Sequence, residues 1–274
     1  MHRGHGIFDT AAIVDGKIYD LEAHLDRFLR SADRSKLRLP GSREEMRDII
    51  VQDHGGERPP RRLDSLLAVV RTRQPRSSLP PQGAEPGFFV MVFAGLSYPE
   101  RWYTEGLRVM TTTYPIKPPL YAITKATNYL PNVLMQMEAK EAGFDNGVFI
   151  DEDGYVGESS NMNVAFVTRD AVLVHPKFDH ILAGCTSLRL LELARALQGQ
   201  GPARGALKCA TSPSPRRAPA ARCCSSAAPI KVASVIQWDD QVIGDGKPGP
   251  AGRALLRLLE QDMRSGDRLI PVPC

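Results

Sequence analysis

Short strand-like runs and amphipathic helices follow one another along this chain without a strict strand–helix–strand alternation. The apolar run Gly6–Val14 predicts a strand, and Asp15-Gly16 predicts a tight turn into a return strand. Such a mixture favours an α+β fold over a doubly wound parallel sheet. The predicted strands cover residues 6–14, 17–19, 88–94, 107–113, 146–150, 162–168, 171–174 and 232–238, and the predicted helices cover 22–36, 43–53, 128–142, 186–198 and 250–263.

The sequence also predicts how these elements begin, end and pack. Ser42 and Glu45 have the spacing of a capping box at the start of the helix over 43–53. Gly143 predicts the end of the helix over 128–142, and the continuous apolar run 88–94 predicts a buried strand. Helical periodicity predicts two inward faces: Leu25, Phe28, Leu29 and Ala32 in the first helix, and Leu130, Val133, Leu134, Met137 and Ala142 in the helix over 128–142.

The size and composition fit an ordinary globular protein. The 274 residues suffice for one large or two moderate domains, and the apolar content of 42% and aromatic content of 7% are unremarkable. After Pro99 the pattern of elements begins anew. We therefore expect a smaller N-terminal α+β domain over residues 1–97 and a larger domain over residues 98–274.

No membrane, targeting or metal signal is visible. The N-terminus has no apolar core of signal-peptide length, and no stretch approaches 18 uninterrupted apolar residues. The chain as it stands is therefore expected to be cytoplasmic, without a membrane partner. Its five cysteines are odd in number and form no paired C-x-x-C motif, which predicts thiols in a reducing compartment and no metal site.

The net charge of +4 is distributed unevenly. Residues 58–83 hold six Arg and one Asp, and residues 200–226 hold four Arg and one Lys with no acid, so each window carries +5 and the rest is mildly acidic. Both windows are rich in proline and lack a sustained helix or strand period, which predicts loops. A nucleic-acid contact is the alternative interpretation, but no aromatic platform is interleaved with the arginines, so no nucleic-acid partner is expected.

Three short motifs have the residue types that a pyridoxal phosphate site requires. The run Lys125-Ala-Thr-Asn-Tyr129 offers an amine that can condense with the cofactor's aldehyde. The run Glu158-Ser-Ser-Asn161 offers a carboxylate to keep the ring nitrogen protonated. The run Gly184-Cys-Thr186 precedes an expected helix, whose N-terminus suits a phosphate.

Each of these residues also has an ordinary interpretation. Taken alone, Lys125 is most simply interpreted as a surface lysine, Glu158 as an exposed turn residue and Thr186 as an ordinary N-cap residue. Arg27 projects from the first helix, where it is either a solvated side chain or a charge-assisted contact to the phosphate. The order of the motifs along the chain, rather than any one of them, supports the functional interpretation.

In that order the sequence resembles the class IV, fold-type IV aminotransferases, which use pyridoxal phosphate. The resemblance covers about two-thirds of the chain, and its detail is most similar to the plant-type D-amino-acid transaminases and the aminodeoxychorismate lyases. The matching stretches are Arg3-Gly-His-Gly-Ile-Phe-Asp-Thr10, Leu21-Glu-Ala-His-Leu-Asp-Arg27, Lys125-x-x-Asn-Tyr-Leu130, Gly154-Tyr-Val-Gly-Glu-Ser-Ser-Asn161, Ile181-Leu-Ala-Gly-Cys-Thr186 and Gln237-Trp-Asp-Asp-Gln-x-Ile-Gly244.

The resemblance implies a role for each candidate residue. Lys125 holds the cofactor covalently and moves the substrate's α-proton, and Glu158 pairs with the ring nitrogen. The remaining implied contacts are Arg27, Cys185 and Thr186 on the phosphate, Ser159, Ser160 and Asn161 beside the ring, and Phe8 and Tyr129 in the substrate pocket. It further implies a two-domain fold with a barrel-like sheet in the C-terminal domain, and a homodimer.

Four activities fit these motifs. The first is transamination between an amino acid, such as D-alanine, and a 2-oxo acid. The others are cleavage of aminodeoxychorismate to 4-aminobenzoate and pyruvate, branched-chain transamination, and a catalytically silent relative or basic binding module, which the two anomalous windows suggest. The chain begins where relatives already have a first strand, so a plastid protein with a truncated N-terminus is also compatible.

Overall fold

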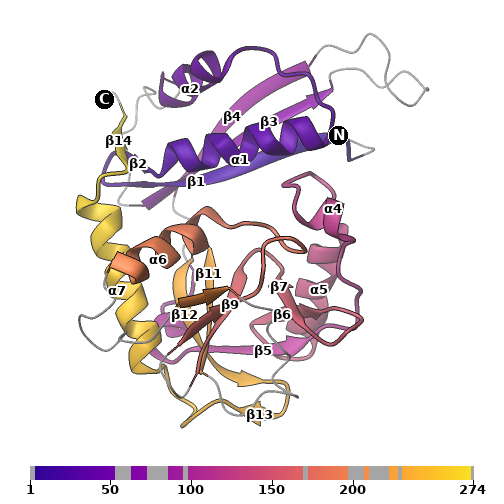
Figure 1. Ribbon diagram of the computed structural model, residues 1–274, viewed down its shortest axis with the longest axis vertical. Coiled ribbons are helices and arrows are strands. Elements are labelled where there is room, and N and C mark those ends of the chain that lie inside the picture. The colour runs from indigo at the N-terminus through magenta and orange to yellow at the C-terminus, as the bar shows by residue number, and fades with distance from the viewer. Residues whose placement is uncertain are drawn as a thin grey trace. The chain divides into compact units, whose positions relative to one another are not determined.

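The computed structural model describes residues 4–52, 63–72, 86–94, 98–168, 172–196, 207–209, 222–227 and 230–272 (Figure 1). The chain divides into two compact units. Unit 1 comprises residues within Met1–Ser97, Thr124–Asn128 and Met263–Cys274, and unit 2 comprises those within Tyr98–Ile123 and Tyr129–Asp262. Each unit has its own sheet and its own apolar core.

Unit 1 is built on a five-stranded antiparallel sheet in the order β14-β2-β1-β3-β4. The turn between its first two strands has positive φ angles at Asp15 (47°) and Gly16 (74°), so the predicted tight turn is confirmed. The strands are β1 (Gly6–Val14), β2 (Lys17–Tyr19), β3 (Leu63–Thr72), β4 (Pro86–Ala94) and β14 (Leu269–Pro271).

Helix α1 (Leu21–Arg34) packs across this sheet (Figure 1). Its predicted inward residues Leu25, Phe28 and Ala32 are at most 2% exposed and form a core with Ile7, Ala11 and Ile13 of β1. Leu29 is partly buried against the same core. The predicted face is therefore confirmed.

Helix α2 (Arg43–Gln52) begins at the predicted capping box. The Glu45 backbone N–H donates to Ser42 Oγ at 3.1 Å, and the Ser42 N–H donates to Glu45 Oε2 at 2.7 Å. Two of the N–H groups at the start of the helix are satisfied in this reciprocal way. The spacing of the two residues therefore predicted the start of α2 correctly.

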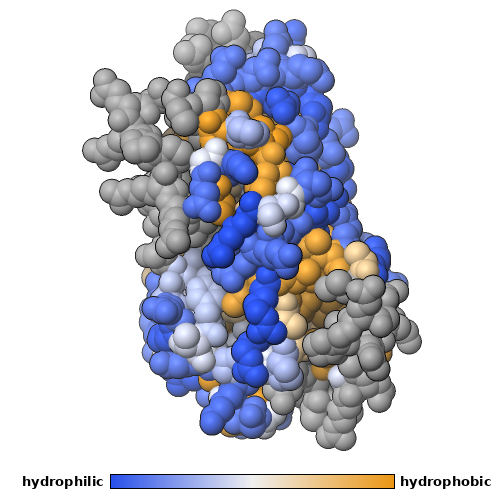
Figure 2. All heavy atoms as spheres, turned by 90° about the vertical axis from the view of Figure 1, so that its left-hand side faces the viewer, coloured by the Kyte–Doolittle hydropathy of each residue, from blue (hydrophilic) through white to orange (hydrophobic). Residues whose placement is uncertain are grey.

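The prediction of a buried strand over residues 88–94 was half right. The strand forms as β4, but Met91, Val92 and Phe93 are 37%, 44% and 43% exposed. Because β4 lies at the edge of the sheet, it has a neighbouring strand on one side only within the described residues. Apolar side chains are visible on the surface of unit 1 in Figure 2.

Unit 2 contains a nine-stranded mixed sheet in the order β10-β9-β8-β11-β12-β5-β6-β7, with β13 paired to β12. A further pairing of β7 with β8 curls the sheet back on itself, so the predicted barrel-like sheet is confirmed. Its strands are β5 (Leu107–Thr111), β6 (Asn146–Ile150), β7 (Val156–Ser159), β8 (Asn163–Val167), β9 (Leu173–His175), β10 (Leu207–Cys209), β11 (Arg222–Ala227), β12 (Lys231–Trp238) and β13 (Gln241–Val242).

The curled sheet encloses a core of Leu107, Val109, Val148, Val164, Val235 and Trp238, among others. The helices that follow the strands are α3 (Arg101–Thr104), α4 (Pro119–Ala122), α5 (Leu130–Glu141), α6 (Cys185–Ala196) and α7 (Pro250–Ser265). Parallel pairs β5–β6 and β5–β12 occur beside antiparallel pairs, which confirms the α+β class. Among the described helices, none is both long enough and apolar enough to cross a bilayer.

The prediction of loops over residues 58–83 and 200–226 was wrong for parts of both windows. Strand β3 lies in the first window and pairs along its whole length with β1 and β4. Strand β10 and most of β11 lie in the second. In the first window the run Leu66-Leu-Ala-Val-Val70 has the apolar, β-branched character of a strand, but averaging over its arginine-rich flanks concealed it. The other residues of both windows lie outside the described ranges.

The predicted inward face of α5 was also wrong. Leu130, Val133 and Met137 are 67%, 49% and 51% exposed, and Ala142, just beyond the helix, is exposed too, whereas Leu134 is half-buried. The buried residues of this helix are Asn132, Met135 and Ala139. On this buried side Met135 packs closely against Gly147 of β6, where an added Cβ would lie 2.3 Å from Met135 Cγ.

Candidate active site

Lys125 is held by backbone contacts to β1 in unit 1. The Phe8 N–H donates to the Lys125 carbonyl oxygen at 3.1 Å, and the Thr127 N–H donates to the Gly6 carbonyl oxygen at 2.9 Å. The Lys125 N–H in turn donates to Ser31 Oγ of α1 at 3.2 Å. These contacts join three parts of the chain that are distant in sequence and fix the backbone from which the lysine side chain projects.

The Lys125 side chain lies over the ring of Phe8. Its Nζ is 4.6 Å from the ring centroid, a cation–π distance, and both side chains are half-buried. The predicted lysine and the predicted pocket residue are therefore neighbours. Phe8 is carried by β1, which positions it from the sheet rather than from a loop.

Arg27 lies in a buried network of α1 and β1. Its Nε and Nη2 donate to the two carboxylate oxygens of Asp9 at 2.8 and 2.6 Å, and His24 Nδ1 is 2.7 Å from Asp9 Oδ1. All three residues are at most 6% exposed. Burial by itself would raise the pKa of Asp9, but the charges of Arg27 and His24 and their hydrogen bonds hold that pKa well below its usual range.

Glu158 lies near the end of β7 in unit 2 and is 6% exposed. Its Oε2 accepts a hydrogen bond from the Leu182 N–H at 3.1 Å, and its backbone pairs with Asn163 of β8. A buried carboxylate is costly without compensating partners, so this backbone donor helps to keep it in place. The alternative interpretation of Glu158 as an exposed turn residue is excluded.

Asn163, which the sequence prediction missed, holds the loop that leads into Cys185 and Thr186. Its Oδ1 accepts hydrogen bonds from the Gly184 N–H at 3.2 Å and from Ser187 Oγ at 3.0 Å, and its Nδ2 donates to the Leu182 carbonyl oxygen at 2.9 Å. A Cβ on Gly184 would lie 2.2 Å from Asn163 Oδ1, so this loop requires glycine. No local pattern in the sequence indicates these contacts, because Gly184 lies 21 residues after Asn163.

Cys185 and Thr186 form the first turn of α6, as the motif predicts. They are 3% and 5% exposed, and the Gly184 loop held by Asn163 leads into them. The first N–H groups of a helix have no partner within it and attract anions. The location of Thr186 therefore suits a phosphate, and it suits an ordinary helix start equally well.

The polar residues after Glu158 have structural partners in unit 2. Ser159 Oγ donates to the Gly147 carbonyl oxygen at 2.5 Å, and Ser160 Oγ donates to Asn146 Oδ1 at 2.9 Å. Asn161 is exposed. Tyr129, just before α5, is half-buried, with Lys117 Nζ 5.2 Å from its ring centroid. Ser159 and Ser160 thus brace the loop that carries Glu158.

Residues 6–207 match the family model of the class IV amino-transferases. The chain belongs to this family. It is 41% identical over 272 residues to the chloroplastic D-amino-acid transaminase of Arabidopsis thaliana, covering 97% of this chain and 70% of that protein. It is 26% identical to the D-alanine aminotransferase of Bacillus licheniformis, covering 96% and 89%. The family resemblance predicted from the motifs is therefore confirmed.

The fold of this class IV aminotransferase also has solved counterparts. The branched-chain aminotransferase of the archaeon Thermoproteus uzoniensis, solved with norvaline, superposes with a TM-score of 0.86. The alignment covers 99% of this chain and 91% of that one at 21% identity, so it shows the shared fold alone.

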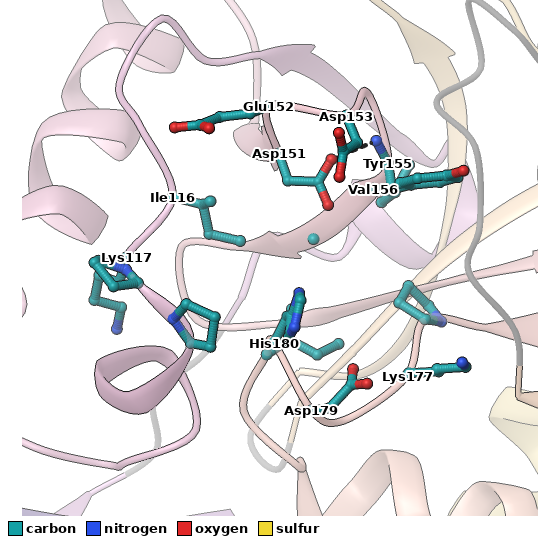
Figure 3. A pocket seen from close by; sticks show the side chains of 15 residues that line it. Ile116, Lys117, Asp151, Glu152, Asp153, Tyr155, Val156, Lys177, Asp179 and His180 are labelled. Atoms are coloured by element: carbon teal, nitrogen blue, oxygen red, sulfur yellow. Dashed lines mark hydrogen bonds between the residues drawn. The ribbon is translucent and has the colours of Figure 1, made fainter.

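A cavity of about 370 Å³ lies in unit 2 of this aminotransferase beside β7 (Figure 3). Its walls are the acidic hairpin Asp151–Tyr155, the segment Ile116–Pro119 and the loop Pro176–Ile181. Gly157 and Ile181, which line it, are direct chain neighbours of Glu158 and Leu182. None of the predicted site residues lines this cavity, so it is distinct from the groups described above.

The residues of each unit fit one part of pyridoxal phosphate chemistry. In unit 2, the buried carboxylate of Glu158 suits a protonated ring nitrogen, and the glycine-requiring loop before α6 suits the close approach of a phosphate. In unit 1, the half-buried amine of Lys125 suits covalent attachment. Arg27 offers a buried guanidinium whose Nε and Nη2 already bind Asp9.

Proposed function

We propose that this aminotransferase binds pyridoxal 5'-phosphate and transfers an amino group between a D-amino acid, such as D-alanine, and a 2-oxo acid. The observation that carries the proposal is the buried Glu158 carboxylate fixed by the Leu182 N–H on the strand-and-loop segment that leads into α6. The substrate class is supported by the 41% identity to a protein named D-amino-acid transaminase.

Each candidate residue would have its own role in binding the cofactor or in moving the proton. Lys125 Nζ would hold the cofactor covalently, and after substrate binding it would accept the α-proton and return it. Glu158 would place a negative charge at the ring nitrogen. The N–H groups at Cys185 and Thr186, together with Arg27, would bind the phosphate. When bound, the cofactor supplies an electron sink for the negative charge at the substrate's α-carbon.

The remaining predicted residues would shape the site. Ser159, Ser160 and Asn161 would flank the ring, and Phe8 and Tyr129 would line the substrate pocket. We also propose a homodimer, and a division into a smaller domain over residues 1–97 and a larger one over 98–274. Two segments of the larger range, Thr124–Asn128 and Met263–Cys274, depart from this division because they belong to unit 1. The compartment stays a prediction, although the Arabidopsis relative is named chloroplastic.

The decisive experiment is a visible absorption spectrum of the purified protein with added pyridoxal phosphate. The wild type should acquire a visible band that survives gel filtration, and Lys125→Ala should lose it, because covalent attachment needs that amine. Lys17→Ala, an exposed lysine in the same unit, is the matched control and should keep the band. Identical spectra for the wild type and Lys125→Ala would refute the assignment.

Substrate assays then separate the activities that share this cofactor. D-alanine with 2-oxoglutarate should be converted, whereas L-alanine, L-leucine and aminodeoxychorismate should not. Activity with aminodeoxychorismate alone would replace the transaminase proposal with a lyase, and activity with L-leucine alone would replace it with a branched-chain enzyme.

A further inference from the structure

Ser31 is a fully buried serine of helix α1. Its hydroxyl donates to the Arg27 carbonyl oxygen, one turn earlier in the helix, at 2.9 Å, and accepts a hydrogen bond from the Lys125 N–H at 3.2 Å. The residue is 0% exposed. One hydroxyl therefore contacts the backbones of both residues of unit 1 that carry the cationic groups of the proposed site.

The hydroxyl of Ser31 is oriented for its contact with Lys125. A serine hydroxyl has one hydrogen to donate and two lone pairs that accept. Because the hydrogen is used by the Arg27 carbonyl oxygen, a lone pair remains for the Lys125 N–H. A hydrogen bond from serine to the carbonyl group four residues earlier slightly destabilises a helix, and alanine is the better helix former. The benefit of a serine at this position therefore lies in its contact with Lys125.

The Lys125 backbone is also held from strand β1. The Phe8 N–H donates to the Lys125 carbonyl oxygen at 3.1 Å, and the Thr127 N–H donates to the Gly6 carbonyl oxygen at 2.9 Å. These contacts join two main chains, whereas the contact on the amide side of Lys125 comes from a side chain of α1. A substitution can therefore remove the contact to α1 and leave the contacts to β1 in place.

Lys125 needs a fixed backbone because its side chain has to move. In the proposed function its amine is first bound to the cofactor, is then released, and then moves a proton. A lysine amine ends a flexible four-carbon stem, so the position of the backbone limits the points that Nζ can reach. Nζ lies 4.6 Å from the centroid of the Phe8 ring, and Phe8 also binds the Lys125 carbonyl oxygen. Holding the Lys125 backbone therefore also keeps the amine beside this ring.

We propose that Ser31 is a positioning residue for Lys125, because its buried hydroxyl holds the backbone from which the amine reaches the cofactor and the substrate. This inference rests on the proposed covalent role of Lys125 and assigns no chemical step to Ser31 itself. A misplacement of about 1 Å can cost on the order of 100-fold in rate, so the loss of this one hydrogen bond should be measurable in the kinetics of Lys125.

The first test is the rate at which the visible band forms when cofactor-free protein is mixed with pyridoxal phosphate. Ser31→Ala should slow this step about 10-fold, because the amine then projects from a less fixed backbone. Pyridoxamine phosphate has no aldehyde and cannot attach to a lysine. Its dissociation constant should stay within about 2-fold of the wild-type value, because the groups proposed to bind the phosphate are unchanged.

Ala32→Gly is the matched control for this variant. Ala32 is the next residue of α1 and is 1% exposed, and glycine in place of alanine destabilises a helix while the Ser31 hydroxyl stays in place. This less stable variant should still form the band at the wild-type rate. An equal loss of rate in both variants, an equal loss of rate and of pyridoxamine phosphate affinity in Ser31→Ala, or a wild-type rate in Ser31→Ala would overturn the inference.

The second test needs no cofactor and measures hydrogen exchange of single backbone amides by NMR. In Ser31→Ala the Lys125 amide should exchange about 5- to 10-fold faster, as expected for the loss of one hydrogen bond. The Thr127 amide, which donates to Gly6, should not change. The ratio of the two rates cancels any general loosening of unit 1, so an unchanged ratio would contradict the positioning role.

The two tests separate this inference from the proposed function. A wild type that never forms the visible band would refute the covalent role of Lys125 and, with it, the role of Ser31, whatever the exchange rates show. A wild type that forms the band, together with a Ser31→Ala variant that forms it equally fast, would refute the inference alone and leave the proposed function intact.

Discussion

Helices α1 and α5 have similar apolar periodicity, yet they pack in opposite ways. In α1 the predicted stripe faces the sheet, and Leu25 and Phe28 are at most 2% exposed. In α5 the predicted stripe faces outward, and Leu130 is 67% exposed. Periodicity thus located a stripe in both helices but identified the side that faces the chain's own core in only one.

The difference lies in the polar residues on the inward faces. In α1 the buried charge of Arg27 meets Asp9 on the neighbouring strand. In α5 the inward residues Asn132 and Gln136 donate to the backbone carbonyl oxygens of Ser160 and Asp145. A buried polar group is tolerated where it has a partner. The positions of these partners, which lie 9 to 28 residues away in sequence, therefore decide which side of each helix faces the core.

The largest expected effect is the loss of a core side chain from α1. Phe28 is 1% exposed, so Phe28→Ala should lower the free energy of opening of unit 1 by about 3–5 kcal/mol. Met137→Ala, the matched change on α5, should alter the opening of unit 2 by less than about 1 kcal/mol. Hydrogen exchange read separately in the peptides of α1 and α5 measures both. Equal effects would mean that the two helices are buried alike.

The buried ion pair of α1 should come next. Asp9→Asn leaves the Arg27 guanidinium buried without its carboxylate, at a cost of about 3 kcal/mol. Because the pKa of Asp9 is lower in the folded state than in the unfolded state, its contribution is complete above about pH 5 and is lost as the pH falls. Wild type and Asp9→Asn should therefore begin to converge in stability below about pH 4, and they should approach each other further as the pH falls toward the lowered pKa of folded Asp9.

The control for that variant is the exposed pair of Arg43 with Glu22, whose side chains are 31% and 46% exposed. Arg43→Met should cost less than about 1 kcal/mol at any pH, because solvent screens the pair. A stability difference between wild type and Asp9→Asn that stays constant between pH 7 and about pH 2.5 would contradict the ion-pair account.

Features that depend on neighbouring residues were predictable from the sequence. The capping box of Ser42 and Glu45 and the turn at Asp15-Gly16 each involve residues within a few positions, and both formed as expected. The family and its order of motifs were recognisable for a different reason. The residues of the three site motifs are distinctive types at characteristic positions.

Features that depend on distant partners were not predictable. Strand β3 is held by pairing to β1 and β4, and its arginine-rich flanks obscured its apolar run. The role of Asn163 is visible only once the Gly184 loop returns to it. Likewise, the contact of Thr127 with Gly6 joins residues 121 positions apart, and no local pattern indicates it.

The sharpest test of the comparison is a substitution that periodicity and structure judge differently. Asn132→Leu would enlarge an apolar surface of α5, so sequence pattern alone predicts a gain in stability. The structure predicts a loss of about 1–3 kcal/mol, because Asn132 is 4% exposed and its donor to the buried Ser160 carbonyl oxygen disappears. Hydrogen exchange in the peptide around Ser160 should accelerate, while Lys140→Leu on the exposed side should leave it unchanged. Slower exchange in Asn132→Leu would show that the inward amide does not hold the site loop, and the contrast between the two helices would then need another cause.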